Sequence, residues 1–328
     1  MSVTATVSSC ETQVGRNREA EIGRALQSFW DAEMPDLGEA ILRTIAYADV
    51  FDYPLTSQEI HRYLIGHAAP ISAVEEALAH TGRLRERLGS VSPLWFLAGR
   101  EELISVRQER EGFAARLWPA ARRYSQCIAA VPFVRMVGLT GALAMNNVSG
   151  PGDDIDLLVI MQGGRIWLGR GLIVLLVRLA RRQRVHLCPN YILSERTLEL
   201  GERDLFTAHE LVQMVPFVES SLYRRLLDTN AWLAGYLPNA SPRAPMNGAM
   251  SRMAGLGQCC AERLLASHLG DVVERWERER KIPRLRLEAA QSSGGGATFT
   301  PDVCKGHMAD HGSLVYRQYT ARLAALGL

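Results

Sequence analysis

Two aspartates one residue apart, Asp154 and Asp156, are the residues of this sequence best placed to do chemistry. They open an apolar run, residues 157–160, which is typical of a buried strand. Side chains two residues apart on a strand point to the same face, so the two carboxylates are expected to project together. Adjacent carboxylates need a cation between them, and Mg²⁺ (or Mn²⁺) binds one or two carboxylates together with substrate phosphate oxygens. The pair therefore predicts a divalent-metal site for a substrate that carries phosphate.

A glycine turn precedes the acid pair at Thr140, Gly141 and Ala142. Glycine permits a tight turn, and a helix that starts there offers backbone N–H groups to phosphate oxygens. We expect this turn to hold the phosphates, with the hydroxyl of Thr140 beside them.

The stretch from Val137 to Ile160, VGLTGALAMNNVSGPGDDIDLLVI, resembles the nucleotidyltransferase superfamily related to polymerase β. That family's signature is an apolar residue, Gly, then Gly or Ser, a spacer of about ten residues, and Asp-x-Asp entering a strand. The resemblance implies Mg²⁺-dependent transfer of a nucleoside monophosphate from a nucleoside triphosphate (NTP) to a hydroxyl of an unknown acceptor. An alternative is a catalytically silent nucleotidyltransferase fold that binds nucleotide or a partner, and a third interpretation is a purely structural α/β protein.

Two departures from the family pattern affect the expected chemistry. The family's serine is replaced by Ala142, and Thr140 is its nearest hydroxyl substitute. The family also places a third carboxylate on a later strand, but the matching segment here, VHLCPNYIL, carries no acid. Asn190 is the nearest polar equivalent; its amide can ligate a metal and cannot accept a proton. Glu195 or Glu199, just beyond that strand, is another candidate for the third position. Asp153 is a further candidate, although as the neighbour of Asp154 it should face away if the strand has begun.

Two further groups of residues carry possible chemistry. His186 and Cys188 share one strand face with Asn190, and they line the pocket or belong to the core. Cys304, His307 and His311 have the C-x₂-H-x₃-H spacing of metal ligands, although no second cysteine pair supports a zinc site. The interpretation we prefer is a loop and helix start that folds over the cleft and brings Lys305 or His307 to the triphosphate.

Alternating strand and helix patterns between residues 133 and 193 predict an α/β (α+β) fold, a mixed sheet with flanking helices. Upstream, three short helical patterns and a hairpin pattern at 88–98 are similar to a winged helix. Capping boxes at Thr56–Glu59 and Ser72–Glu75 mark two of these helix starts. The second helix lacks basic residues, so DNA is a possible partner that we do not favour.

The order of these patterns predicts four regions. We expect a disordered tail at 1–18, a winged-helix-like domain at 19–100, a nucleotidyltransferase-like domain at 101–200 and a helical region at 201–328. A linker helix at 101–130, broken near Pro119, is expected to join the second region to the third. The segment 204–239 is similar to uncharacterised bacterial nucleotidyltransferase-like proteins with a leading winged helix. That resemblance implies that Glu210, Gln213 and Asn230 lie on helices beside the cleft.

Composition sets outer limits on function. The net charge is only +2, which gives no electrostatic case for bulk nucleic-acid or membrane binding. Six cysteines without CxxC pairing suggest reduced thiols and a cytoplasmic protein. The most apolar window, residues 166–180, contains Arg170 and Arg178 and is too short to span a bilayer, so a peripheral membrane role is the alternative left open there.

Overall fold

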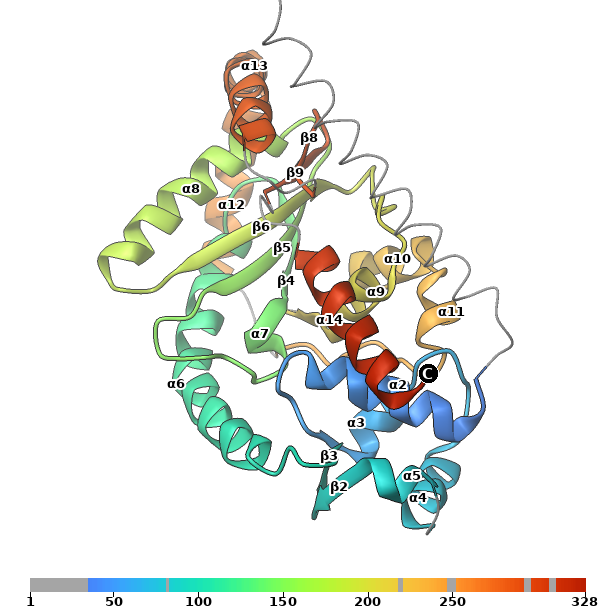
Figure 1. Ribbon diagram of the computed structural model, residues 1–328. Helices are drawn as coiled ribbons and strands as arrows, with labels where there is room; N and C mark the ends of the chain where they lie inside the picture. Colours follow the sequence, from blue (N-terminus) through green and yellow to red (C-terminus); the bar gives the residue numbers. More distant parts are fainter. Residues whose placement is uncertain (1–34, 81–82, 218–220, 247–251, 292–295, 307–310) are drawn as a thin grey trace, which may run out of the picture.

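A mixed six-stranded sheet lies at the centre of the computed structural model, which describes residues 35–80, 83–217, 221–246, 252–291, 296–306 and 311–328 (Figure 1). The strands are ordered β7-β4-β5-β6-β9-β8. Their bounds are Val134–Leu139 (β4), Ile155–Met161 (β5), Leu187–Ser194 (β6), Val215–Pro216 (β7), Thr298–Phe299 (β8) and Val303–Lys305 (β9). The expected mixed α/β class is confirmed. The tail expected at 1–18 lies outside the described residues.

The three central strands set the geometry of the acid pair. β4 and β5 are antiparallel, whereas β5 and β6 are parallel and are joined by the long helix α8 (Ile166–Arg182). In the parallel pair, Asp156 lies beside Cys188 and Met161 beside Ser194. The polar residues at the start of β5 therefore lie beside those at the start of β6.

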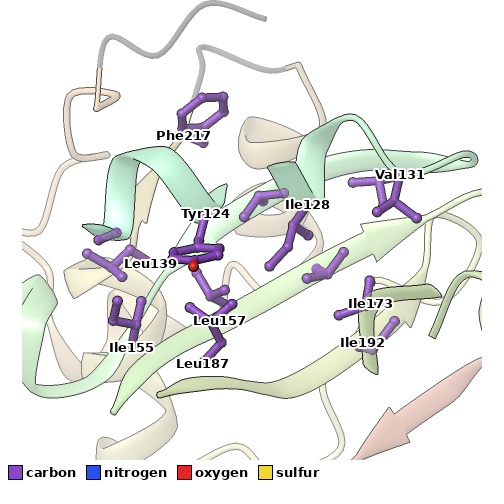
Figure 2. Close-up of a cluster of buried hydrophobic side chains, with 14 of the residues drawn as sticks. Tyr124, Ile128, Val131, Leu139, Ile155, Leu157, Ile173, Leu187, Ile192 and Phe217 are labelled. Carbon is purple, nitrogen blue, oxygen red and sulfur yellow. The ribbon is translucent and has the colours of Figure 1, made fainter. Parts of the chain in front are cut away.

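The two faces of the sheet are covered by different helices. Helices α6 (Leu103–Ala129) and α8 pack on one face over a first core cluster, and Figure 2 shows Tyr124 and Ile128 of α6 beside Leu139 and Leu157. A second core cluster joins the other face to α9 (Leu205–Gln213), α10 (Ser221–Thr229), α11 (Leu233–Tyr236) and α14 (His311–Leu326). Odd-numbered residues of β5, beginning with Ile155, belong to the first cluster, whereas Leu158 and Ile160 belong to the second. Because side chains alternate along a strand, Asp156 lies on the same face as Leu158 and Ile160, which is the face covered by α9.

The N-terminal unit combines short helices with a three-stranded sheet ordered β1-β3-β2. The Thr56–Glu59 capping box is present as predicted. The box predicted at Ser72 is wrong, because the helix begins one residue earlier at Ile71, after Pro70, with no side-chain cap. The elements are α2 (Leu37–Asp49), β1 (Leu55–Thr56), α3 (Ser57–Arg62), α4 (Ile71–Ala79), α5 (Arg83–Arg87), β2 (Leu88–Val91) and β3 (Leu94–Leu97).

The break predicted in the linker helix near Pro119 is absent. Helix α6 runs without interruption through that proline. Proline removes one N–H donor from the helix ladder. Leu117 and Ala121, on either side of it, are both buried in the first core cluster. We infer that this packing compensates for the lost hydrogen bond.

The chain after residue 200 is mostly helical, as expected, but it also supplies β7, β8 and β9 to the central sheet. Helix α9 is capped by Asp204, which accepts from the backbone N–H of Thr207. Residues 221–236 form two helices, α10 and α11. Two more helices, α12 (Arg252–Leu265) and α13 (His268–Gln291), follow, and α13 continues past Pro283.

The N-terminal unit packs directly against the helices of the second cluster. The ring of Tyr47 in α2 stacks on His209 of α9, with centroids 4.0 Å apart and planes 16° from parallel. Buried Asp49 of α2 accepts from Arg322 of α14 at 2.6 Å and from Arg100 at 3.3 Å. The N-terminal unit is therefore tied to α9 by an aromatic contact and to α14 by an ion pair. In the described part of the chain, no helix is long and apolar enough to cross a membrane.

Candidate functional site

The two predicted acids meet at the start of β5. Asp154 precedes the strand and is exposed, whereas Asp156 lies within it and is partly buried. Burial, followed by the charge of Asp154, raises the pKa of Asp156 to about 7. Ile155 between them is fully buried in the first cluster, so the acids lie on the opposite face. The structure thus brings Asp154 and Asp156 together as the alternation predicts.

The glycine turn lies directly against Asp156. The backbone N–H of Thr140 donates to the backbone oxygen of Asp156 at 3.0 Å. Gly141 follows with a φ of +65°, and a Cβ there would overlap Oδ2 of Asp156. Helix α7 (Gly141–Ala144) is a single turn, and it places Ala142 partly buried against the first cluster.

A buried hydroxyl marks the same turn. Thr140 is 5% exposed, and its Oγ1 is one of the few buried side-chain atoms in the described residues without a hydrogen-bond partner. An unsatisfied buried hydroxyl is costly, so such an atom calls for an explanation. A ligand oxygen at the turn would supply the missing partner.

Gly141→Ala is expected to lower the free energy of unfolding by about 2–3 kcal/mol, because it combines left-handed backbone strain with overlap onto Asp156. Gly164 provides the matched control, since it has a φ of +78° and open space around its Cβ position. Gly164→Ala should cost only the backbone part, about 1–2 kcal/mol. Chemical denaturation of both variants measures the difference, and equal losses would show that the approach to Asp156 is not tight.

Strand β6 supplies hydrogen-bond donors to the acids. The Nδ2 of Asn190 donates to Oδ1 of Asp156 at 3.1 Å, and the thiol of Cys188 also bonds that carboxylate. Both bonds favour the ionised form of Asp156 but do not outweigh burial and Asp154. Nδ1 of His186 lies 3.5 Å from Asp154. The strand face predicted from alternation therefore contacts the acid pair.

Glu195 lies at the other end of the strand pair. Its backbone N–H donates to the oxygen of Met161, the last residue of β5. Met161 is five residues from Asp156, which corresponds to about 16 Å along a strand. Glu199 is exposed and pairs with Arg203. The structure does not bring Glu195 to the acids, because the parallel register carries it away from them.

A different carboxylate stands near Asp156. Glu210 of α9 is partly buried on the same side of the sheet. Burial, followed by the charge of Asp156, raises the pKa of Glu210 to about 7, and Lys305 acts in the opposite direction. The resemblance of residues 204–239 implies that Glu210 lies beside the cleft, but it assigns no role to this residue. That resemblance and the position of Glu210 on an amphipathic helix after the sheet are the signals in the sequence that point to it.

Lys305 reaches this side of the sheet from a strand and not from the predicted loop. It lies on β9 opposite Tyr191 of β6. Its Nζ is 2.7 Å from Glu202 and 5.7 Å from the centre of the Tyr191 ring. Lys305 therefore places a cation on the side of the sheet that carries Asp156 and Glu210.

The remaining predicted residues serve other purposes or lie outside the description. Asn230 is fully buried and bonds the backbone at Leu198 and Leu200, so it holds a loop and does not line the site. Cys304 is buried in the first core cluster, away from Lys305. The predicted His307 and the side chain of His311 are outside the described residues. Within the described ranges, no three His, Cys, Asp or Glu side chains are arranged as a metal-ligand set.

Comparisons with known proteins add no assignment, since no family model, curated protein or solved structure matches the chain.

Proposed function

We propose that the chain is a divalent-metal-dependent nucleotidyltransferase that moves a nucleoside monophosphate from an NTP to an acceptor hydroxyl. The observation that carries the proposal is the acid pair Asp154 and Asp156 lying against the Gly141 turn. Within the described residues, neither acid forms an ion pair with Lys or Arg, and His186 is the nearest cationic candidate. Carboxylates arranged in this way favour a bound cation.

The donor set fits Mg²⁺ or Mn²⁺. Asp154 and Asp156 offer only oxygen donors, which hard divalent cations prefer, and Mg²⁺ takes its other ligands from water and substrate phosphate. Two protein carboxylates are therefore enough, without a third protein ligand. When bound, the metal would neutralise charge on the phosphates and orient the reacting group.

The other residues of the site have roles that follow from their positions. The unpartnered hydroxyl of Thr140 and the open space at Gly141 suit phosphate oxygens at the turn. Lys305 would attract the triphosphate, in competition with Glu202. Asn190 holds the carboxylate of Asp156 in place. Glu210, whose pKa lies near neutrality, would accept the proton of the acceptor hydroxyl.

A catalytically silent nucleotidyltransferase fold is the alternative, and one observation favours it. On β6, Cys188 and Asn190 donate to Asp156 where the family would place an acid. Such a protein would bind nucleotide without turning it over. Its N-terminal unit would then carry the function as a regulatory module.

We further propose that the N-terminal unit is a winged-helix-like module that contacts protein and not DNA. Helix α4, which follows the capped helix α3, exposes Glu75 and Glu76 and contains no basic residue. Carboxylates at this position repel DNA phosphates. The aromatic contact between Tyr47 and His209 couples the module to α9, which carries Glu210.

A thermal-shift screen with ATP, GTP, CTP and UTP, each with and without Mg²⁺ or Mn²⁺, tests the nucleotide site. One NTP with metal is expected to stabilise the protein by about 3 kcal/mol at 100 times its Kd. The Asp154→Asn/Asp156→Asn double variant should lose this shift. The charge-matched control Asp228→Asn/Asp302→Asn, on α10 and in the β8–β9 turn, should keep it. The absence of any shift with all four nucleotides would refute the site.

Release of pyrophosphate distinguishes the enzyme from the silent fold. Metal-dependent pyrophosphate release in the presence of hydroxyl-bearing acceptors supports transfer. A nucleotide-induced thermal shift without pyrophosphate release across the acceptors would favour the regulatory alternative.

A further inference from the structure

One arginine joins the two helices that carry the phosphate turn and the proposed base. Nη1 of Arg243 donates to the backbone oxygen of Ala144 at 2.6 Å and to the backbone oxygen of Gln213 at 3.3 Å. Ala144 is the last residue of α7, and Gln213 is the last residue of α9. A single guanidinium nitrogen therefore bridges the C-terminal ends of both helices.

This contact suits an arginine at helix ends. The last carbonyl groups of a helix have no partner within the helix, and they carry the negative end of its dipole. Among the described residues, Arg243 forms no ion pair with a carboxylate, and no hydrogen bond joins α7 directly to α9. Arg243 therefore supplies the hydrogen-bonded link between the two helices.

The two helices carry different parts of the proposed site. Thr140 and Gly141 form the phosphate turn at the start of α7. Glu210 lies on α9, within one turn of Gln213. Because α7 and α9 contact each other directly, the spacing of their ends affects the distance between the turn and the carboxylate of Glu210.

The segment that carries the arginine, residues 238–246, is held by the N-terminal unit, and we call it the strap. The Nδ2 of Asn239 donates to the backbone oxygen of His61 at 3.1 Å. The guanidinium of Arg62 donates to the backbone oxygen of Ser241 and, at 3.2 Å, to its hydroxyl. Helix α3 of the N-terminal unit therefore fixes the first half of the strap.

The second half of the strap is fixed beside the central sheet. The backbone N–H of Arg243 donates to the hydroxyl of Tyr223 at 3.2 Å. The backbone N–H of Met246 donates to the oxygen of Pro216 in β7 at 2.7 Å. Because the backbone is held on both sides of Arg243, its guanidinium is kept where it bridges α7 and α9.

Helix α7 has further support that does not depend on Arg243. Leu143 and Ala144 are buried in the first core cluster, and the backbone N–H of Thr140 donates to the backbone oxygen of Asp156. Loss of the arginine should therefore leave the phosphate turn in place and release mainly the end of α9.

We propose that Arg243 is a positioning residue for nucleotidyl transfer, which sets the distance between the carboxylate of Glu210 and the phosphate turn. The inference rests on the proposed function and adds to it a residue that acts through Glu210. A displacement of about 1 Å at a reacting group lowers the rate by about 10²-fold. Loss of the bridge is therefore expected to affect kcat and not NTP binding.

Steady-state pyrophosphate release by the full chain tests the proposal. Arg243→Met removes every donor and keeps an unbranched side chain, so it should lower kcat about 10- to 100-fold. The KM for NTP should stay within about threefold of wild type. Arg243→Lys should recover part of the rate, because an ammonium group also donates to carbonyl oxygens. Arg225→Met, which changes an exposed arginine on α10, is the matched control and should behave as the wild type does.

A double variant shows whether Arg243 acts through Glu210. Once Glu210→Gln has removed the base, the position of that side chain no longer affects the rate. Arg243→Met/Glu210→Gln should therefore be no slower than Glu210→Gln alone. A change that only destabilises the fold would lower the rate equally on both backgrounds, and the melting temperatures of the variants identify such a change.

Three results would overturn the inference: equal kcat in Arg243→Met and Arg225→Met, equal losses in Arg243→Met and Arg243→Lys, or losses that multiply in the double variant. If Arg243→Met does not fold, Arg62→Met, which releases the strap at Ser241, should lower kcat in the same way, and wild-type turnover by it would also overturn the inference. Absence of metal-dependent pyrophosphate release by the wild type would refute the proposed function and the inference with it, whereas the other failures leave the wild type active.

Discussion

Glu210→Gln is expected to lower kcat for nucleotidyl transfer by about 10²- to 10⁴-fold, the range typical for loss of a general base. The affinity for NTP and metal should stay within about threefold of wild type, since Glu210 is not part of a ligand set with the two aspartates. Steady-state rates of pyrophosphate release, combined with nucleotide titration, measure the two effects separately.

The reason is the location of Glu210, a carboxylate near Asp156 whose pKa is raised to about 7. Asn190 occupies the corresponding place on β6 and donates its amide to Asp156, so it cannot act as a base. Glu210 approaches from α9, and its pKa of about 7 matches a base that works near neutrality. Because the charges of Glu210 and Asp156 interact, the rate should rise through an apparent pKa that belongs to both groups.

Glu199→Gln is the matched control, because Glu199 is an exposed glutamate that pairs with Arg203 before α9 begins. It should leave kcat and the pH profile unchanged. Wild-type turnover by Glu210→Gln would remove Glu210 from the mechanism. If Glu210→Gln lowers the rate but leaves the pH profile unchanged, Glu210 only positions another group.

The local geometry of the acid pair, the glycine turn and the Thr56–Glu59 box can be predicted from the sequence, because each depends on residues that are close together in the chain or on neighbouring strands. Asp154 and Asp156 project together through strand alternation, and Gly141 lies against Asp156 because β4 and β5 are adjacent antiparallel strands. The Thr56–Glu59 box is also local, as both of its hydrogen bonds span three residues. Each of these follows from the conformation of a few consecutive residues or of neighbouring strands.

The position of Glu210 near Asp156 could not be predicted from short-range spacing in the sequence. Glu195 is near Asn190 in the chain, but the parallel register moves it to the far end of β5. Glu210 is distant in the chain from Asp156, yet helix packing on the second core cluster brings them close enough for their charges to interact. Which helix covers which face is a tertiary property, so spacing along the chain favours Glu195, which lies at the far end of β5 from Asp156.

Periodicity likewise predicts a helix better than it predicts the side that is buried. The spacing of Leu265, Leu269, Val272 and Trp276 is typical of one amphipathic helix, but the chain turns between α12 and α13 and exposes most of this row. Burial goes instead to Glu274, whose carboxylate satisfies the first N–H groups of α8. Pairing of the unsatisfied N–H groups at the N-terminus of α8 therefore outweighs burial of the apolar row in deciding which side of α13 packs against the protein.

Asp156→Asn is expected to stabilise the metal-free protein at alkaline pH, by up to about 4 kcal/mol at pH 8. The folded-state pKa of Asp156 is raised to about 7, whereas an unfolded aspartate titrates near 3.8. A raised pKa means that the folded state holds the proton more tightly, so stability is full below about pH 4 and is lost as pH rises through 7. Asparagine cannot ionise and can still accept the hydrogen bond from Asn190, so the variant avoids that loss.

Chemical denaturation in a chelating buffer at pH 4, 6 and 8 measures this effect. The difference between Asp156→Asn and wild type should be small at pH 4 and largest at pH 8, while Asp228→Asn, an exposed aspartate on α10, should show no such trend. Adding Mg²⁺ and the matching NTP at pH 8 should stabilise the wild type and leave Asp156→Asn unchanged, since the ionised carboxylate is what the metal requires. A variant that is equally destabilised at every pH would mean that Asp156 already has a stabilising partner, and that the acid pair does not depend on a cation.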